Sequence, residues 1–313
     1  MGRTLRQQPA KSDEMASDYT AAALAAGDSV RIVAARTTSV VASAQQRHGC
    51  SPTVTAALGR LLTGAALMGS FLKGRERITL QVNGAGPVRG MVAEASADGR
   101  VRGYPLRPRA ELPLNAAGKF DVGGVIGAGY LHVTRSFNTG QPYTSAVPLA
   151  TGEVGDDLAR YFAHSEQVPS VVAVGVLANP GGVIAAGGFL AHLLPGAVES
   201  TINVLEENVR GLPHVSTLIR ERISPEQIVE RVAGALGARV TQAAAVSFTC
   251  TCSRDRVTRV LVGLGEGELD QMARAHEDTE VTCDFCSQRY YFSPQEIGEL
   301  RRSASGAADA TNG

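Results

Sequence analysis

Apolar and polar residues alternate along several short segments in the first two thirds of the chain. From Asp28 the apolar positions are Val30, Ile32 and Ala34, which is the two-residue period of a half-buried strand. Further short strands are predicted at 78–82, 88–95, 101–104, 130–135, 143–149, 171–177 and 183–194. Turn residues such as Asn83-Gly84 and Asp98-Gly99 separate some of these segments, so the pattern predicts an antiparallel sheet.

Two helices are predicted among these strands. Ser51-Pro52 supplies an N-cap and a proline at the first helical position, and the helix should run to about Leu72. Arg60 and glycines interrupt its apolar run, which favours a buried helix over a membrane span. A shorter amphipathic helix is predicted at 156–164, and the glycine-rich segment 123–129 is predicted to be a turn. Residues 28–195 are therefore expected to form an α+β core domain.

The pattern becomes helical after Pro195. Ser224-Pro225 with Gln227 forms a capping box, and apolar residues recur among Glu and Arg at helical spacing. Residues 196–246 are predicted to be a helical linker with an apolar face that packs on another surface. The end segments 1–27 and 303–313 are predicted to be disordered tails.

Composition and charge exclude some classes of partner. The 313 residues carry 30 basic and 30 acidic side chains, so no global field attracts the protein to nucleic acid or to an anionic membrane. The segment 247–302 holds seven Arg against ten Asp or Glu, which is a poor composition for binding phosphates. We therefore expect neither a nucleic-acid partner nor a membrane partner.

Four of the five cysteines form two close pairs near the C-terminus. The pairs are Cys250-Thr-Cys252 and Cys283-Asp-Phe-Cys286. Two such pairs can complete a tetrahedral tetrathiolate shell, which suits one Zn²⁺ ion. A shell with four protein ligands leaves no position for a reactive water, so a structural or redox role is favoured and no enzyme activity is expected.

Other interpretations of the cysteines compete with a redox switch. Permanent disulfides are disfavoured because no secretory signal is evident and Cys50 has no partner in the pattern, which indicates a cytoplasmic protein with reduced thiols. A static zinc ribbon that binds nucleic acid or a protein partner remains open. A thiol oxidoreductase is disfavoured because Cys283 precedes a predicted hairpin and not a helix. Cys50 itself is predicted to be an ordinary buried thiol.

The cysteines belong to a small predicted module at 247–302. Short helices are expected between the pairs, followed by a strand at 289–292 and a last helix capped by Ser293 and Glu296. Because so short a segment can bury only a thin core, zinc should contribute most of its folding free energy. The same thiolates are the form of cysteine that peroxide attacks.

Three strings of residues resemble the redox-regulated 33-kilodalton heat-shock chaperone family. They are Cys250-Thr-Cys-Ser-Arg-Asp-Arg256, Cys283-Asp-Phe-Cys-Ser-Gln-Arg-Tyr-Tyr-Phe292 and the upstream Tyr161-Phe-Ala-His-Ser-Glu-Gln-Val-Pro169. The resemblance covers about residues 28 to 302. It implies an ATP-independent holdase that is inactive while reduced and zinc-bound.

The resemblance also implies how such a protein would be activated. Its zinc ligands would be Cys250, Cys252, Cys283 and Cys286, and oxidation would form the disulfides Cys250–Cys252 and Cys283–Cys286. Zinc would then be lost, the module and linker would unfold, and the exposed apolar surface would bind unfolded client proteins and promote a homodimer. Glu166, which lies in the upstream string, is expected to fix a turn or an interface.

Overall fold

The computed structural model describes residues 17–179, 181–275 and 277–309. The chain divides into two compact units, with the boundary between Thr249 and Cys250. The larger unit contains two β-sheets and most of the helices, and the smaller unit contains both cysteine pairs.

The first sheet of the larger unit is antiparallel throughout, in the strand order β10-β1-β2-β9-β8. Its strands are β1 (Tyr19–Ala25), β2 (Val30–Arg36), β8 (Ser170–Asn179), β9 (Gly182–Leu193) and β10 (Ala238–Ala245). Both faces of this sheet are covered. Ile32 and Ala34 of β2 point into one apolar cluster, whereas the alternate residues Val33 and Ala35 point into another.

The second sheet has the order β11-β5-β4-β3-β6-β7. Its strands are β3 (Arg77–Gly84), β4 (Gly90–Ser96), β5 (Arg100–Pro105), β6 (Gly129–Ser136), β7 (Tyr143–Pro148) and β11 (Ser247–Phe248). All neighbours are antiparallel except β11, which runs parallel to β5. The predicted strands are confirmed, with ends that differ by a few residues.

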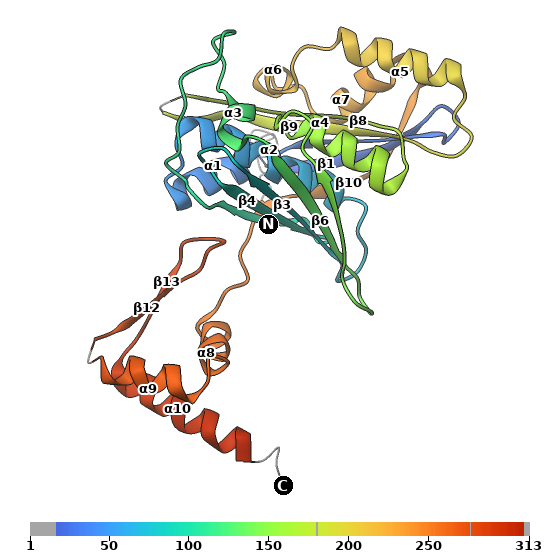
Figure 1. Ribbon diagram of the computed structural model, residues 1–313. Helices are drawn as coiled ribbons and strands as arrows, with labels where there is room; N and C mark the ends of the chain where they lie inside the picture. Colours follow the sequence, from blue (N-terminus) through green and yellow to red (C-terminus); the bar gives the residue numbers. More distant parts are fainter. Residues whose placement is uncertain (1–16, 180, 276, 310–313) are drawn as a thin grey trace, which may run out of the picture. The chain divides into compact units, whose positions relative to one another are not determined.

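Helix α2 (Pro52–Gly69) fills the space between the two sheets and contacts strands of both (Figure 1). Sixteen of its 18 residues are buried, and the Ser51 side chain accepts a hydrogen bond from the Val54 amide at 3.2 Å, as the N-cap pattern predicts. Helix α1 (Thr38–His48), the short α3 (Val122–Ile126), α4 (Gly155–Tyr161) and a π-helical turn (Phe162–Glu166) complete this part of the unit. Of the helices that the structure describes, none has the length and apolar character to cross a membrane.

Three further helices cover the outer face of the first sheet (Figure 1). They are α5 (Glu199–Gly211), α6 (Val215–Arg220) and α7 (Pro225–Ala233), and a 3₁₀ turn follows at Gly234–Leu236. Leu205, Leu218 and Ile228, one from each helix, are at most 2 % exposed and pack on the strands. The predicted apolar face of segment 196–246 therefore packs on the first sheet, and the capping box at Ser224 and Gln227 is present.

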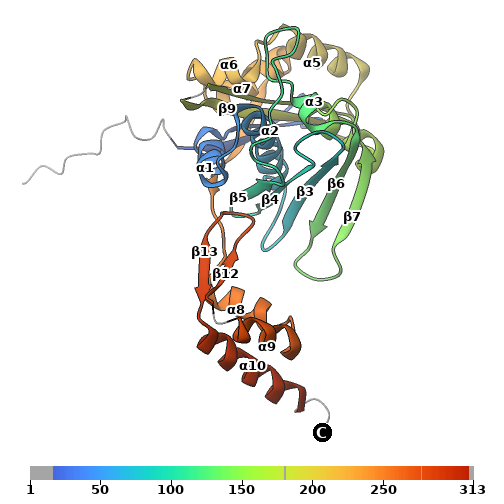
Figure 2. The ribbon, with the colours of Figure 1, turned by 60° about the vertical axis from the view of Figure 1, so that its left-hand side comes forward.

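The described part of the smaller unit consists of helices and a β-hairpin (Figure 2). It comprises α8 (Arg254–Val262), α9 (Glu266–Arg274), β12 (Thr279–Thr282), β13 (Arg289–Phe292) and α10 (Pro294–Asp309). Its apolar core is thin. In the described part of the unit it contains the buried residues Val257, Leu261, Leu269, Phe292 and Ile297.

Several expectations are corrected by the structure. Within the predicted tail 1–27, residues 19–25 form β1, and the predicted tail 303–313 is helical to Asp309; residues 1–16 and 310–313 lie outside the described residues. The last part of segment 196–246 is not helical but forms β10, which pairs with β1. The start of segment 247–302 belongs to the larger unit, because β11 pairs with β5. The predicted turn at 123–129 contains α3, whose first turn is capped by Asp121.

Candidate metal centre

Each cysteine pair lies in a short connection beside a regular element. Cys250 and Cys252 lie between β11 and α8, and Ser253 then caps α8 by accepting a hydrogen bond from the Arg256 amide at 3.2 Å. Cys283 and Cys286 lie in the turn that joins β12 to β13. The Cys286 and Ser287 amides donate to the Cys283 carbonyl oxygen at 3.3 and 2.8 Å, and this tight turn directs both sulfurs to one side.

The fold brings all four predicted ligands together. Their Sγ atoms lie within 4.8 Å of one another. Two separations across the pairs are shorter, with Cys250 Sγ 3.7 Å from Cys283 Sγ and Cys252 Sγ 3.4 Å from Cys286 Sγ. Four sulfurs at about 2.3 Å from one zinc ion, in tetrahedral geometry, are about 3.8 Å apart. The donor set and its spacing therefore fit a metal ion of this kind.

The electrostatics of the four sulfurs also favour a bound cation. Burial, together with neighbouring Cys250, raises the pKa of Cys283, and burial raises the pKa of Cys286. These shifts mean that several thiolates packed together are unfavourable without a compensating positive charge. A divalent cation supplies that charge and makes the deprotonated form the stable one.

Tyr290 of β13 adds a contact that the cysteine spacing does not reveal. Its hydroxyl donates a hydrogen bond to Cys252 Sγ at 3.1 Å. This hydrogen bond is the main reason that the pKa of Tyr290 is raised to about 12. Tyr290 thus links the second hairpin strand to the first cysteine pair, and the only sequence signal for it is its place four residues after Cys286.

Polar contacts hold the elements around the cysteines. The Arg254 guanidinium lies 4.2 Å from the Phe292 ring centroid, donates to the Tyr291 carbonyl oxygen at 2.8 Å and pairs with Glu296 at 2.6 Å. Asp270 of α9 pairs with Arg301 of α10 and, at 2.6 Å, with Arg274. These contacts are partly or largely exposed, so screening by solvent keeps the contribution of each to the stability of the unit small.

Two other residues of interest lie in the larger unit. Cys50 is buried, and burial raises the pKa of its thiol to about 12, which agrees with the expected unreactive thiol. Glu166 accepts a hydrogen bond from the Tyr161 hydroxyl and pairs with Arg135 at 3.1 Å. The carboxylate therefore joins the π-helical turn to strand β6, and it forms no part of the sulfur site.

Comparison with known proteins identifies the relatives of this chain. The family described as Hsp33 protein matches residues 18–293. A 33 kDa chaperonin of Geobacillus kaustophilus is 44% identical over 92% of this chain and 98% of its own, and one of Desulforamulus reducens is 41% identical over 90% and 97%. The crystal structure of the 33 kDa chaperonin from Thermotoga maritima superposes with a TM-score of 0.87 at 38% identity, covering 93% of this chain and 99% of that one.

Proposed function

The chain belongs to the Hsp33 family, a family of heat-shock chaperones, and from this premise we propose that it is a redox-regulated, ATP-independent holdase. In the reduced state its four clustered thiols hold zinc and the protein is inactive. After oxidation it binds unfolded proteins and prevents their aggregation. The observation that carries this proposal is the cluster of four sulfurs within 4.8 Å in a unit with a thin core.

The four cysteines Cys250, Cys252, Cys283 and Cys286 are the proposed ligands of one zinc ion. Bound zinc would hold the sulfurs as thiolates and contribute an apparent ~10–16 kcal/mol to the folding of the small unit. The described core of that unit contains only Val257, Leu261, Leu269, Phe292 and Ile297 as buried apolar residues. Ligation by the cysteines is therefore expected to decide whether the unit is folded.

Oxidation of the thiolates is the proposed trigger. Formation of each disulfide from two thiolates releases two electrons. One hydrogen peroxide accepts these electrons and, with two protons, becomes two molecules of water. Two peroxides thus convert the four thiolates into two disulfides, and the sulfurs no longer bind metal. As the unit unfolds, sequence neighbours keep the highest effective concentration, which favours Cys250–Cys252 and Cys283–Cys286 over the cross-pairs that are closest in the folded state.

For the oxidised protein to act as a holdase, unfolding of the small unit must also expose an apolar surface elsewhere in the chain. Strand β11 and the turn to Cys250 follow β10 directly in the chain, and α5 to α7 precede it. These helices cover the apolar outer face of the first sheet, where Ile32, Ala34 and Phe189 are buried. We infer that loss of the small unit frees this layer, that the uncovered surfaces bind client segments, and that two such chains associate as a homodimer. A thiol switch of this kind requires a reducing compartment such as the cytoplasm.

One sample can test the switch. Zinc release and free thiols are measured before and after peroxide, together with the aggregation of a chemically denatured client protein. The expected result is one zinc lost as four thiols disappear, with suppression of aggregation only after oxidation. Peptide mapping of the oxidised protein should find the two neighbour disulfides, and sedimentation should show a dimer.

Matched cysteine variants separate the sulfur cluster from general oxidation. Cys286→Ser removes one ligand and should abolish stoichiometric zinc binding and redox control. Cys50→Ala changes a buried thiol outside the cluster and should leave both intact. Equal suppression of aggregation by reduced and oxidised protein, or loss of the switch in Cys50→Ala alone, would contradict the proposal.

A further inference from the structure

The chain crosses from one sheet to the other just before the first cysteine pair. Strand β10 ends with Ala245 at an edge of the first sheet, and β11 begins with Ser247 at an edge of the second. We call residues 245–249 the strap, because this segment joins the two edges. Cys250, a proposed zinc ligand, follows the strap directly.

Three backbone hydrogen bonds hold the strap on the larger unit. The amides of Val246, Ser247 and Thr249 donate, each at 3.0 Å, to the carbonyl oxygens of Asp18, Gly99 and Val101, respectively. Gly99 has a positive φ, and a Cβ on it would collide with the Ala245 carbonyl oxygen, so only glycine permits this close approach. Strand β11 is only two residues long, so these bonds alone make a weak attachment.

The side chain of Phe248 supplies a further attachment. Successive residues of a strand point to opposite faces, and Phe248 packs against the apolar core of the larger unit. The Arg47 guanidinium, in the last turn of α1, lies 5.4 Å from the Phe248 ring centroid, which is within the range of a cation–π contact. Helix α1 lies beside β5 (Figure 2) and also contacts β11. Phe248 is therefore held both by the core and by the end of α1.

The strap and the first proposed zinc ligand depend on the same stretch of backbone. Thr249 makes the last backbone hydrogen bond of the strap, and the next residue, Cys250, belongs to the sulfur cluster. Ligation of Cys250 restricts the backbone that follows the strap, so less conformational entropy is lost when the strap docks. A docked strap in turn restricts the backbone that carries Cys250. Docking of the strap and ligation of the metal should therefore favour each other.

Strand β10 connects the strap to the helices that cover the first sheet. It lies at an edge of that sheet, where it pairs with β1, and most of its residues are exposed. Helix α7 contacts both β1 and β10. An edge strand that loses the attachment at one end opens from that end. Release of the strap therefore loosens β10 first and α7 next.

We propose that the strap couples the sulfur cluster to the larger unit in both directions, and that Phe248 sets the strength of this coupling. Loss of the metal loosens the strap and β10. Conversely, a weakened strap lowers the affinity of the cluster for zinc, although Phe248 is not a ligand. Because the coupling is reciprocal, the two effects have the same size. The proposal rests on the proposed function for zinc as the bound ion and for the step from loosened helices to client binding.

Hydrogen exchange and zinc affinity measure the two directions on reduced, full-length protein. In the unchanged protein, removal of zinc with a chelator should speed the exchange of the strap and β10 amides at least about fivefold, the lower end of typical couplings between sites. Phe248→Ala should lower the zinc affinity by the same factor in competition with a chromophoric chelator. Phe248→Leu keeps an apolar side chain on the core and should retain most of the affinity.

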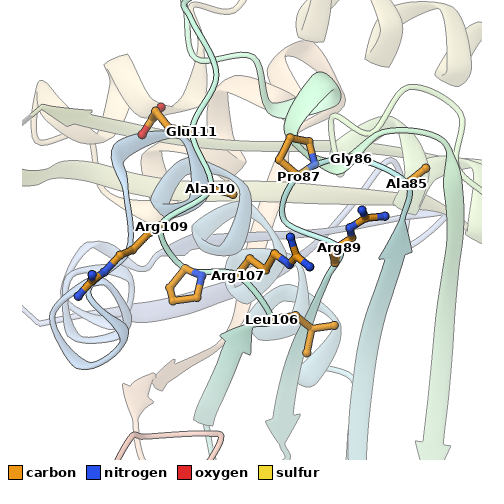
Figure 3. Close-up of a pocket in the computed structure, with 10 residues that line it drawn as sticks. Ala85, Gly86, Pro87, Arg89, Leu106, Arg107, Arg109, Ala110 and Glu111 are labelled. Carbon is orange, nitrogen blue, oxygen red and sulfur yellow. The ribbon is translucent and has the colours of Figure 1, made fainter.

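A control substitution and an insertion make the test specific. Leu106→Ala also removes an apolar side chain, but Leu106 is 56% exposed in the open pocket beyond the other end of β5 (Figure 3), so both measurements should stay unchanged. Insertion of Gly-Ser-Gly-Ser-Gly-Ser between Thr249 and Cys250, at the boundary of the two units, keeps the strap and all four cysteines. In the inserted protein the zinc affinity should no longer depend on Phe248, and chelation should no longer change the exchange of β10.

Three results overturn the proposal. They are equal exchange of β10 with and without zinc in the unchanged protein, unchanged zinc affinity in Phe248→Ala, and effects that persist in the inserted protein. If Phe248→Ala does not fold, Arg47→Gln takes its place. This variant removes the cation from the Phe248 ring and should lower the zinc affinity in the same direction.

The coupling and the holdase switch fail in different measurements. Suppression of aggregation that does not depend on oxidation overturns the proposed function and leaves the coupling standing. Zinc that is bound and released as expected, while the exchange of β10 and α7 does not respond, leaves the sulfur switch standing and overturns the coupling. A reduced protein that binds no zinc overturns both.

Discussion

The Tyr290 hydroxyl is a single group whose removal should change the affinity of the sulfur cluster for zinc. It donates to Cys252 Sγ at 3.1 Å and so stabilises negative charge on that sulfur. Tyr290→Phe keeps the ring and removes the donor. Zinc affinity of the reduced protein should fall about tenfold, the lower end of the effect of such supporting hydrogen bonds. Competition with a chromophoric chelator measures the change.

The neighbouring tyrosine is the matched control. Tyr291 lies on the same strand with 48% of its surface exposed, and β-strand side chains alternate between faces. Tyr291→Phe should therefore leave zinc affinity unchanged. If both variants lose zinc equally, the effect belongs to the stability of the hairpin and not to the hydrogen bond.

His192 is a buried titratable group, and its hydrogen bond to Ser170 indicates that Nδ1 carries the ring proton. The Ser170 hydroxyl donates to the Val168 carbonyl oxygen at 2.8 Å, so it accepts from Nδ1–H of His192, with Oγ and Nδ1 2.7 Å apart. Burial, together with the positive charges of Arg31 and Arg135, lowers the pKa of His192 to about 4. Protonation is therefore easier in the unfolded chain than in the folded one.

This shift predicts a pH dependence of stability. Between the unfolded pKa of about 6.5 and the folded pKa of about 4 the unfolded state binds more protons, so stability is lost as pH falls through that window. From about pH 7.5 to about pH 5 the loss due to His192 should be about 2 kcal/mol. The measurement is urea unfolding at both values.

The variant His192→Asn isolates this contribution. Asparagine keeps a donor near the Nδ1 position and has no titration, so the variant should lack the loss of about 2 kcal/mol. Burial raises the pKa of Asp18 to about 6, which gives the opposite slope, but Asp18 is present in both proteins and cancels in the comparison. The same pH slope in both proteins would refute the assignment.

Among the elements, a substitution in α7 tests whether the layer formed by α5, α6 and α7 keeps the reduced protein inactive, as proposed. Ile228 is fully buried between α7 and the first sheet, and Ile228→Ala should cost about 2–5 kcal/mol by leaving a cavity. Because that cavity loosens the layer specifically, we expect reduced protein carrying this change to suppress client aggregation in part.

Leu61→Ala in α2 is the control at this scale. Leu61 is also fully buried, but it lies in the other core, between the sheets. A similar loss of stability is expected, without activity in the reduced state. If the two variants suppress aggregation equally, general destabilisation explains the activity and the layer has no special role.

The elements differ in how far sequence alone could predict them. Helix α2 carries its own start signal in Ser51-Pro52, and β2 carries a clear alternation. Strands β1 and β10 are rich in alanine and become strands because they pair with each other and, for β1, with β2. Helix α1 has no side-chain cap from Thr37, because Asp18 accepts from the Val40 amide at 2.7 Å. Such partners are distant in sequence and leave no local signal.

The sulfur site could be predicted because, unlike these strand pairings, it has a local signal in the sequence. Its four cysteines form two local pairs, and the spacing within each pair is typical of a metal site. The hydrogen bond from Tyr290 depends on the hairpin register, which sets Tyr290 opposite Val281, and spacing carries no such information. Glu166 was recognisable only as part of a resembling string, because its partner Arg135 lies far off in sequence on strand β6.

At the scale of the whole molecule, the two units should respond differently to loss of metal. The larger unit has two apolar cores of its own, whereas the small unit has a thin one. Chelation of zinc from reduced protein should remove hydrogen-exchange protection from residues 254–302 and leave α2 and the strands around it protected. Retained protection of α8 and α10 without metal would contradict a metal-dependent fold.

The pairing of β1 with β10 has a consequence for synthesis of the protein. The register joins Tyr19 to Ala245, so β1 leaves the ribosome more than 200 residues before its partner β10. Until α7 is made, shortly before β10, the outer face of β1 and β2 stays open to other nascent chains. A member of a chaperone family thus completes its own first sheet late, just before its first cysteine pair is translated.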